Sequence, residues 1–193
     1  MEHFYTNVNG WFDFESLYSK MVDEAAEGAS FVEVGAFYGK SAAFMAVEII
    51  NSGKNIDFHV VDTWRGSPEH QDGGFDRQEA MINDTAFDIF TANMSPVAGK
   101  YIPHKMPSLE AAALFEDNSL DFVFIDAMHD YEAVKDDINT WYPKVKVGGY
   151  IGGHDYGENL PPILAGVYAA VNEVIGKDNI TVYHTSWLTK KEV

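Results

Sequence analysis

The sequence contains no cysteine, few basic residues and no long apolar run. The absence of cysteine excludes disulfide bridges, thiolate metal sites and a cysteine nucleophile. Only 13 lysine and arginine residues oppose 30 aspartate and glutamate residues, which gives a formal net charge of −17. Such a charge repels phosphate backbones and anionic lipids, so we expect neither a nucleic acid nor a membrane as a partner. No apolar run reaches the roughly 18 residues that span a bilayer.

The remaining composition is that of a globular protein. The chain has 193 residues, of which 46% are hydrophobic and 14% aromatic. This length fits one domain, residues 1–193, which we divide into an N-terminal helical segment, residues 1–29, and a core, residues 30–193. The first ten residues, MEHFYTNVNG, lack the basic and apolar regions of a signal peptide, so we predict a cytoplasmic protein.

Strand-like and helix-like segments alternate along the chain. The expected strands are 31–34, 57–62, 100–104, 120–125, 145–151, 180–184 and 187–190. The expected helices are 13–27, 41–50, 76–94, 108–115, 130–142 and 161–176, with Asp13, Ser108 and Asp130 as N-caps. The alternation indicates a parallel sheet covered on both faces. Two residues separate the last two strands, so these must form an antiparallel hairpin. We therefore predict a doubly wound α/β sheet with a reversed strand at its end.

The first strand-to-helix turn, EVGAFYGKS, is a candidate ligand site, because ligands of open α/β sheets lie beyond the carboxyl ends of the strands. Gly35 and Gly39 allow a tight turn and close approach of a ligand. The turn has neither the three-glycine nicotinamide fingerprint nor the P-loop pattern, which disfavours a nicotinamide oxidoreductase. Glu33 suits a ligand with a cationic part, and a purely structural turn remains the alternative. Asp62 ends the second strand, where a carboxylate can accept both hydroxyls of a ribose.

Two motifs in the second half extend this pattern, FIDAMHDYEAV after the fourth strand and WYPKVKVGGYIGGHDY into the fifth. Together with the glycine turn and Asp62, they resemble the class I S-adenosylmethionine-dependent methyltransferases. The sequence is most similar to the small-molecule O-methyltransferase branch with FIDGxHxYE and GGxxxxHDY signatures, from about residue 30 to the C-terminus. The resemblance implies a Rossmann-like, seven-stranded, mostly parallel sheet with a reversed last strand. It also implies S-adenosyl-L-methionine as cofactor and methyl transfer to a hydroxyl of a small molecule, a sugar or a phenol.

The resemblance further implies which residues bind the cofactor. Asp62 would hold the ribose, and Asp126, which ends the fourth strand, would lie next to the sulfonium. An acidic lining suits the positive charges of the sulfonium and the ammonium. The residues implied for the methionine end are Glu33, Gly35, Tyr38, Gly39 and Ser41; Thr63 and Trp64 would lie near the ribose, and Pro107 or Ser108 near the adenine.

Asp126, His154 and Asp155 end neighbouring strands, which lie about 4.8 Å apart, so we expect their side chains to converge. Two carboxylates and an imidazole can bind a divalent cation and leave positions open for substrate oxygens. Metal-dependent O-methyltransferases of the catechol and caffeoyl type are similar here, with an Asp after the fourth strand and an Asp-Asn pair after the fifth. Because His154-Asp155 differs from that pair at both positions, Mg²⁺, Mn²⁺, another divalent cation or no metal all remain open.

The predicted catalytic residues are Asp126, His129 and His154. His129 stands where those metal-dependent enzymes carry a lysine general base, and a histidine pKa near ~6.5 suits this task at neutral pH. In the alternative readings, His129 only orients its turn and His154 only bonds to a backbone carbonyl. The rival functions are a metal-independent methyltransferase with His154 as base, and a catalytically silent cofactor-binding module.

Three further segments carry less definite predictions. The loop 64–75, with His70, either covers the small-molecule acceptor or is a flexible connection. The N-terminal segment, with Trp11, is either a lid or a subunit contact, so a homo-oligomer stays among the alternatives. Asp136 and Asp137 are predicted to lie on a solvated helix face.

Overall fold

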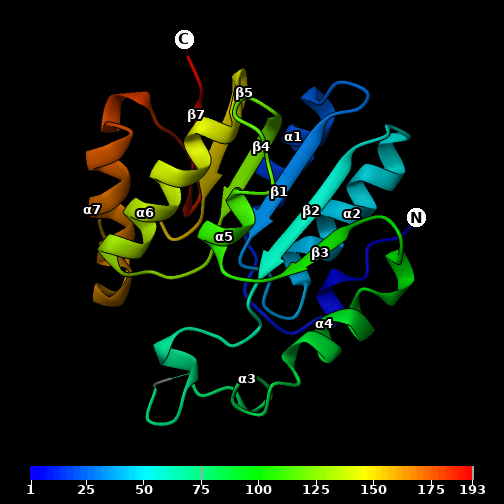
Figure 1. Cartoon of the computed structure of the whole chain (residues 1–193), viewed down its shortest axis with the longest axis vertical. Coiled ribbons are helices and arrows are strands. Elements are labelled where there is room, and N and C mark those ends of the chain that lie inside the picture. Colours follow the sequence, from blue (N-terminus) through cyan, green and yellow to red (C-terminus); the bar gives the residue numbers. More distant parts are fainter. Residues whose placement is uncertain (75, 193) are drawn as a thin grey trace.

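The computed structural model describes residues 1–74 and 76–192, and its centre is a seven-stranded sheet (Figure 1). The strand order is β3-β2-β1-β4-β5-β7-β6, and only β7 runs antiparallel to its neighbours. This confirms the predicted Rossmann-like sheet with a reversed C-terminal strand. The strands are β1 (Ser30–Val34), β2 (Asp57–Asp62), β3 (Ile102–Lys105), β4 (Leu120–Ile125), β5 (Val145–Gly153), β6 (Thr181–Tyr183) and β7 (Ser186–Lys190).

Helices cover both faces of the sheet (Figure 1). One face packs against α1 (Glu15–Glu24), α2 (Lys40–Ser52) and α4 (Ala86–Asn93). The other packs against α5 (Ser108–Ala112), α6 (Tyr131–Trp141) and α7 (Ala165–Val174). Within the described residues, no helix is long and apolar enough to cross a membrane.

Strand β4 shows why the sheet is sandwiched between two layers. Phe122 and Phe124 pack into the α1/α2 core, whereas Val123 and Ile125 pack into the α6/α7 core. Successive side chains of a strand point to opposite faces, so a strand that is apolar throughout needs a hydrophobic layer on each side. The chain becomes polar at Asp126, the first residue after the end of β4.

The three predicted helix caps have different outcomes. Asp130 caps α6 as expected, with Oδ1 accepting the Ala133 N–H at 3.1 Å. The prediction was wrong for Asp13 and Ser108, because neither side chain bonds to the first turn of its helix. Both bond instead to groups distant in sequence, and these tertiary partners outcompete the local cap.

The predicted helix 76–94 is two helices, α3 (Glu79–Ile82) and α4. Asn83, Asp84 and Thr85 separate them, and Asp84 adopts a left-handed conformation with φ of 56°. Asn and Asp tolerate this conformation because their short side chains can bond locally. The loop before α3 lies beyond the carboxyl ends of β1 and β2 (Figure 1), and its predicted aromatic residue Phe75 falls outside the described residues.

Candidate active site

Two adjoining cavities lie at the carboxyl ends of the parallel strands. The Asp62 cavity, about 680 Å³, is lined by Asp62, Thr63 and Ser108 among others. The His129 cavity, about 420 Å³, is lined by residues including Ser41, His129, His154 and Asp155. Both are also lined by Gly35, Phe37, His70, Asp126 and Ala127. The two cavities therefore meet at Asp126.

Gly35 is required where the two cavities meet. Its φ is +91°, and a Cβ at this position would lie 1.9 Å from the backbone oxygen of Asp126. Any side chain would push the turn after β1 away from the end of β4. The glycine thus lets the backbone of the turn lie directly against Asp126.

Asp62 also organises the turn after β1. Its Oδ2 accepts the backbone N–H groups of Ala36 at 2.8 Å and Phe37 at 2.9 Å, and its Oδ1 accepts that of Trp64 at 2.7 Å. Burial raises the pKa of this carboxyl group, an effect that the three N–H donors oppose. Trp64 does not line either cavity; its buried ring donates from Nε1 to the Phe37 oxygen at 2.8 Å.

Phe37, rather than the predicted Tyr38, faces the cavities. Tyr38 is buried in the core, and its hydroxyl donates to Gln78 at 3.2 Å. Phe37 has φ of 49° and lines both cavities. Phe37 and Tyr38 are adjacent aromatic residues, so the sequence could not indicate which of them lines the cavities. The left-handed backbone conformation at Phe37 decides which ring turns outward. Gly39 lines neither cavity and instead begins α2 with φ of +91°.

Glu33 is almost completely buried, with 1% of its surface exposed. Ser41 donates from Oγ to its Oε1, whereas Oε2 has no hydrogen-bond partner among the described residues. Burial is the main reason that the pKa of Glu33 rises to about 8. An unpaired buried carboxyl oxygen is costly. Glu33 itself lines neither cavity, and it is connected to the His129 cavity through Ser41.

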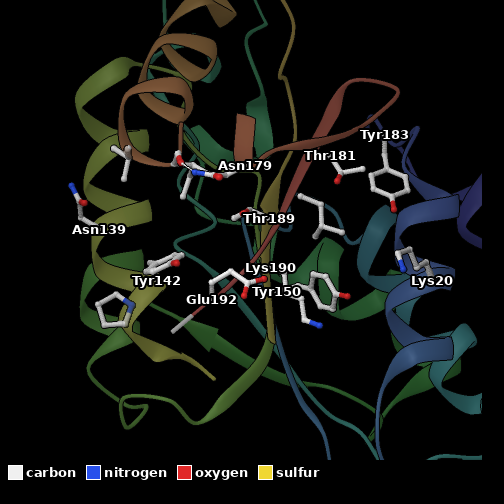
Figure 2. A pocket seen from close by; sticks show the side chains of 14 residues that line it. Lys20, Asn139, Tyr142, Tyr150, Asn179, Thr181, Tyr183, Thr189, Lys190 and Glu192 are labelled. Carbon is white, nitrogen blue, oxygen red and sulfur yellow. Dashed lines mark hydrogen bonds between the residues drawn. The ribbon is translucent and has the colours of Figure 1, made fainter. Parts of the chain in front are cut away.

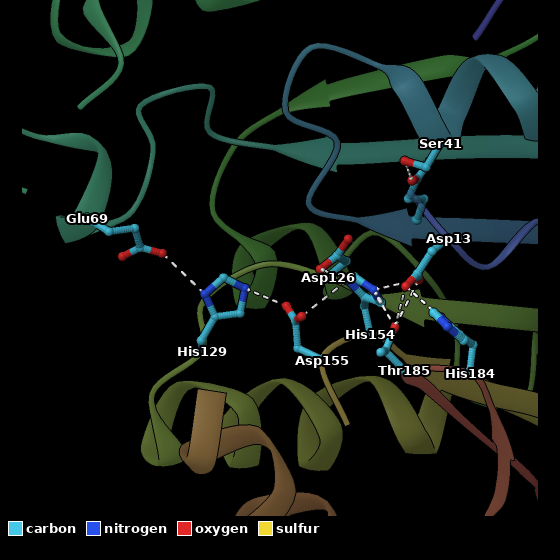
Figure 3. A network of polar contacts seen from close by, with 10 residues as sticks. Asp13, Ser41, Glu69, Asp126, His129, His154, Asp155, His184 and Thr185 are labelled. Atoms are coloured by element: carbon cyan, nitrogen blue, oxygen red, sulfur yellow. Dashed lines mark hydrogen bonds and ion pairs between the residues drawn. The ribbon is translucent and has the colours of Figure 1, made fainter. Parts of the chain in front are cut away.

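Five of the acidic and histidine side chains form a continuous network (Figure 3). His129 lies between two carboxylates, with Nδ1 at 3.2 Å from Glu69 Oε1 and Nε2 at 3.0 Å from Asp155 Oδ2. His154 Nδ1 lies 3.5 Å from both Asp126 Oδ1 and Asp155 Oδ1. The network thus joins the ends of β4 and β5 to the loop that contains Glu69.

The network continues to a residue that was not predicted for the site. His154 Nε2 lies 3.0 Å from Asp13 Oδ1 and 3.0 Å from Thr185 Oγ1 (Figure 3). Asp13 precedes α1, and Thr185 lies in the β6–β7 turn. A separation of 141 residues joins Asp13 to His154, so no local pattern could have indicated this contact.

The carboxylates determine the charge of both histidines. Burial by itself would lower the pKa of His154, but Asp126, Asp155 and Asp13 outweigh it and raise the pKa to about 10. Burial also lowers the pKa of His129, but the carboxylates of Asp155, Asp126 and Glu69 outweigh burial, so this pKa is raised as well. As placed here, His154 holds its proton at neutral pH and is poorly suited to accept another.

Asp126, His154 and Asp155 fit a divalent cation. Each offers one donor atom, and the three atoms lie within 4.8 Å of one another. Donors that bind one ion at about 2.0–2.2 Å are necessarily this close together. Of the groups of three or more acidic or histidine side chains in residues 1–74 and 76–192, this one alone has that spacing.

Ser108 and Asp137 form a polar pair beside the Asp62 cavity. Ser108 donates from Oγ to Asp137 Oδ1 and accepts the indole N–H of Trp141 at 2.8 Å. Asp137 is 5% exposed, so its predicted place on a solvated face was wrong, whereas Asp136 is exposed as predicted. Burial raises the pKa of Asp137 to about 6. Ser108 therefore bonds to the carboxylate of Asp137 and not to a backbone N–H of the first turn of α5.

A larger cavity of about 870 Å³ lies toward the other end of the sheet (Figure 2). Its lining includes Lys20 of α1, Tyr150 of β5 and Lys190 of β7. None of the predicted site residues lines it. Size alone therefore does not locate the site, whereas the convergence of polar strand ends does.

Comparisons with known proteins identify the family and the fold of the chain. The family described as "Methyltransferase domain" matches residues 32–156. No curated protein matches the sequence. Among solved structures, the O-methyltransferase NovP has a TM-score of 0.66 at 17% identity, over 93% of this chain and 79% of its own.

Two further structures have similar folds. The TDP-rhamnose 3′-O-methyltransferase CalS11 of calicheamicin biosynthesis has a TM-score of 0.60 at 15% identity, over 92% of this chain and 76% of its own. A protein described as a putative rRNA methylase from Clostridium thermocellum has a TM-score of 0.60 at 13% identity, over 94% and 97%. At such identities the likeness shows the fold alone, and the acceptor has to be inferred from the site.

Proposed function

The chain belongs to the methyltransferase domain family, and on this premise we propose that it moves a methyl group from S-adenosyl-L-methionine to a hydroxyl of a small molecule. The observation that carries the proposal is the meeting of two cavities at Asp126. One cavity can hold the cofactor and the other the acceptor, with the methyl group at their junction. Such alignment supplies much of the rate of a group transfer.

The cofactor would occupy the Asp62 cavity. Asp62 Oδ1 accepts one backbone N–H, so it keeps capacity for a ribose hydroxyl. Thr63, Met106 and Ser108 line the same cavity and would surround the adenosine. Glu33 lines neither cavity, but Ser41, which donates to its Oε1, lines the adjoining His129 cavity. The methionine end of the cofactor would therefore extend past Asp126 toward this pair.

The acceptor would occupy the His129 cavity, whose composition favours a phenol over a charged sugar nucleotide. Trp11, Phe37, Ile163 and Leu164 form an apolar wall. Lys40 is the one lysine or arginine among the described residues of the lining, and its Nζ already donates to the Gly10 oxygen at 2.9 Å. Phosphate groups would find acidic neighbours here, whereas an aromatic ring would find apolar contacts.

His129 is the proposed proton acceptor for the acceptor hydroxyl. Asp155 fixes the ring through Nε2, and Glu69 contacts the other ring nitrogen from a loop. A bound hydroxyl would displace Glu69 from Nδ1 and so remove one of the carboxylates that raise the pKa of His129. The neutral imidazole, with its proton on Nε2 toward Asp155, would then accept the hydroxyl proton at Nδ1 as the methyl group is transferred. His154 is the less suitable base because its three carboxylate neighbours keep it protonated.

Asp126, His154 and Asp155 would hold a divalent cation if the enzyme uses one. A bound cation would orient the acceptor hydroxyl and make it more acidic. An imidazole among the ligands favours Mn²⁺, Fe²⁺, Ni²⁺ or Zn²⁺ over Mg²⁺. In the metal-independent alternative, the positive charge of the protonated His154 imidazole would offset the negative charges of Asp126 and Asp155, as a cation would in the other version.

Calorimetry and turnover together test the proposal. We expect S-adenosyl-L-methionine to bind the purified protein, and mass spectrometry to detect methylation within a panel of phenols and neutral sugars. Removal of metals with a chelator should abolish methylation if the cation version is correct, and Mn²⁺ should restore it better than Mg²⁺. Full activity after chelation would support the metal-independent version. Absence of cofactor binding would reject the function.

A further inference from the structure

Carboxylates contact both ring nitrogens of His154, and Asp13 lies on the side opposite Asp126 and Asp155. The Nδ1 of the ring faces Asp126 and Asp155, while its Nε2 faces Asp13. The ring also packs against Phe14, with centroids 4.9 Å apart. A half-turn of the ring about χ2 would put a C–H group where Nε2 now lies and break the contact with Asp13, so this contact favours the observed ring orientation.

Asp13 is itself fixed by several contacts. Thr185 Oγ1 lies 2.9 Å from each of its carboxylate oxygens, and His184 Nδ1 lies 2.7 Å from Oδ2. Lys40 ties the preceding chain to α2 through the Gly10 oxygen. The carboxylate of Asp13 therefore keeps its position without His154. A group that orients another side chain has to be held in place independently of it.

We propose that Asp13 is a positioning residue, which holds His154 with Nδ1 directed at Asp126 and Asp155. Of the two groups near Nε2, the carboxylate of Asp13 is the stronger acceptor, because hydrogen bonds to ionised groups are roughly twice as strong as neutral ones. Thr185 acts mainly as the donor that aligns Asp13. The N-terminal segment thereby completes a site that the ends of β4 and β5 begin.

This role has a consequence for cation binding, which rests on the proposed function. Histidine ligands commonly donate their second ring N–H to a carboxylate, which fixes the ring and raises the basicity of the ligating nitrogen. Asp13 stands in that relation to His154. Loss of such an outer partner typically costs about 10- to 100-fold in metal affinity.

The test compares Asp13→Ala and Asp13→Asn with the wild type and with Asp23→Asn. Asp23 is an exposed aspartate at the end of α1 and serves as the matched control. The first measurement is the ¹⁵N–¹H spectrum of the histidine side chains, in which the signal of His154 is identified by its loss in His154→Gln. We expect a hydrogen-bonded Nε2–H signal in the wild type and Asp23→Asn, shifted in Asp13→Asn and lost to solvent exchange in Asp13→Ala.

The second measurement is the Mn²⁺ dissociation constant, determined without cofactor or acceptor. We expect it to rise about 10- to 100-fold in Asp13→Ala and less in Asp13→Asn, which keeps a neutral acceptor oxygen. If Asp13→Ala does not fold, the histidine spectrum and the Mn²⁺ dissociation constant of Asp13→Asn test the proposal instead. An unchanged Nε2–H signal in the Asp13 variants would overturn the inference. If the wild type binds no Mn²⁺, the cation version of the function fails, and the imidazole spectrum still decides whether Asp13 positions His154.

Discussion

Individual carboxylates in this protein differ in role according to what surrounds them. Asp62 ends β2, Asp126 directly follows β4 and Asp130 precedes α6, and of the three only Asp130 serves as a helix cap. Asp62 holds backbone N–H groups of the glycine turn, and Asp126 stands where the two cavities meet. Substitution at each position should therefore have a distinct effect.

Replacing Asp62 should weaken cofactor binding. Asp62→Ala removes both the proposed ribose acceptor and the anchor of the turn, so we expect the calorimetric dissociation constant for S-adenosyl-L-methionine to rise at least about 10-fold. Asp57→Ala is the matched control, because Asp57 is exposed at the other end of β2. Equal affinities for the two variants would contradict the placement of the ribose.

Replacing His129 should separate catalysis from cofactor binding. We expect His129→Ala to lower kcat by about 100-fold or more, as is usual when a general base is lost, with the affinity for S-adenosyl-L-methionine unchanged. His3→Ala provides the control, since His3 pairs with Glu48 away from both cavities. Unaltered turnover at neutral pH would remove His129 as the proton acceptor.

Packing between helices determines which carboxyl groups change their pKa when the chain folds. The pairing of α5 with α6 buries Asp137 against Ser108, and burial raises the pKa of Asp137 to about 6 from a usual 3.8. The folded state then binds more protons than the unfolded state between these values. Stability contributed by the protonated form is consequently lost as the pH rises from about 4 to about 6.

Asp137→Asn should remove this loss. A shift of about two pKa units corresponds to an upper limit of roughly 3 kcal/mol. We therefore expect the unfolding free energy of Asp137→Asn to exceed that of the wild type by more at pH 7 than at pH 5, as measured by urea denaturation at both values. Asp136→Asn, the less buried neighbour, should show no such difference. Parallel pH dependence in the wild type and Asp137→Asn would show that Asp137 is not buried as described.

The net charge of the whole molecule leads to a prediction about its acceptors. The fold is shared with a protein described as an rRNA methylase, but a net charge of −17 opposes contact with a polyanion. We expect no binding of a short fluorescent RNA by anisotropy at about 50 mM salt, where phosphate contacts would be strong. Binding that weakens as salt is added would instead indicate a nucleic-acid acceptor.

Local sequence patterns determined much of the fold and part of the site. The alternation of apolar segments, the two-residue connection before β7 and the polar residues after β1, β2, β4 and β5 were sufficient for the sheet and its ligand-binding edge. Neighbouring parallel strands end at one edge, so Asp126, His154 and Asp155 could be expected together without coordinates. These features depend on residues close in sequence or on the general geometry of sheets.

Tertiary structure decided the remainder. Asp13 contacts His154 and Glu69 contacts His129, although neither pair shares a motif. Phe37 replaced Tyr38 at the cavities because of one backbone dihedral angle, and Asp137 is buried because α5 packs on α6. Hydrogen bonds formed across 60 to 141 residues depend on how loops and termini close over the sheet. The sequence by itself therefore determined where the chemistry lies, and only the packed chain decided which side chains hold it in place.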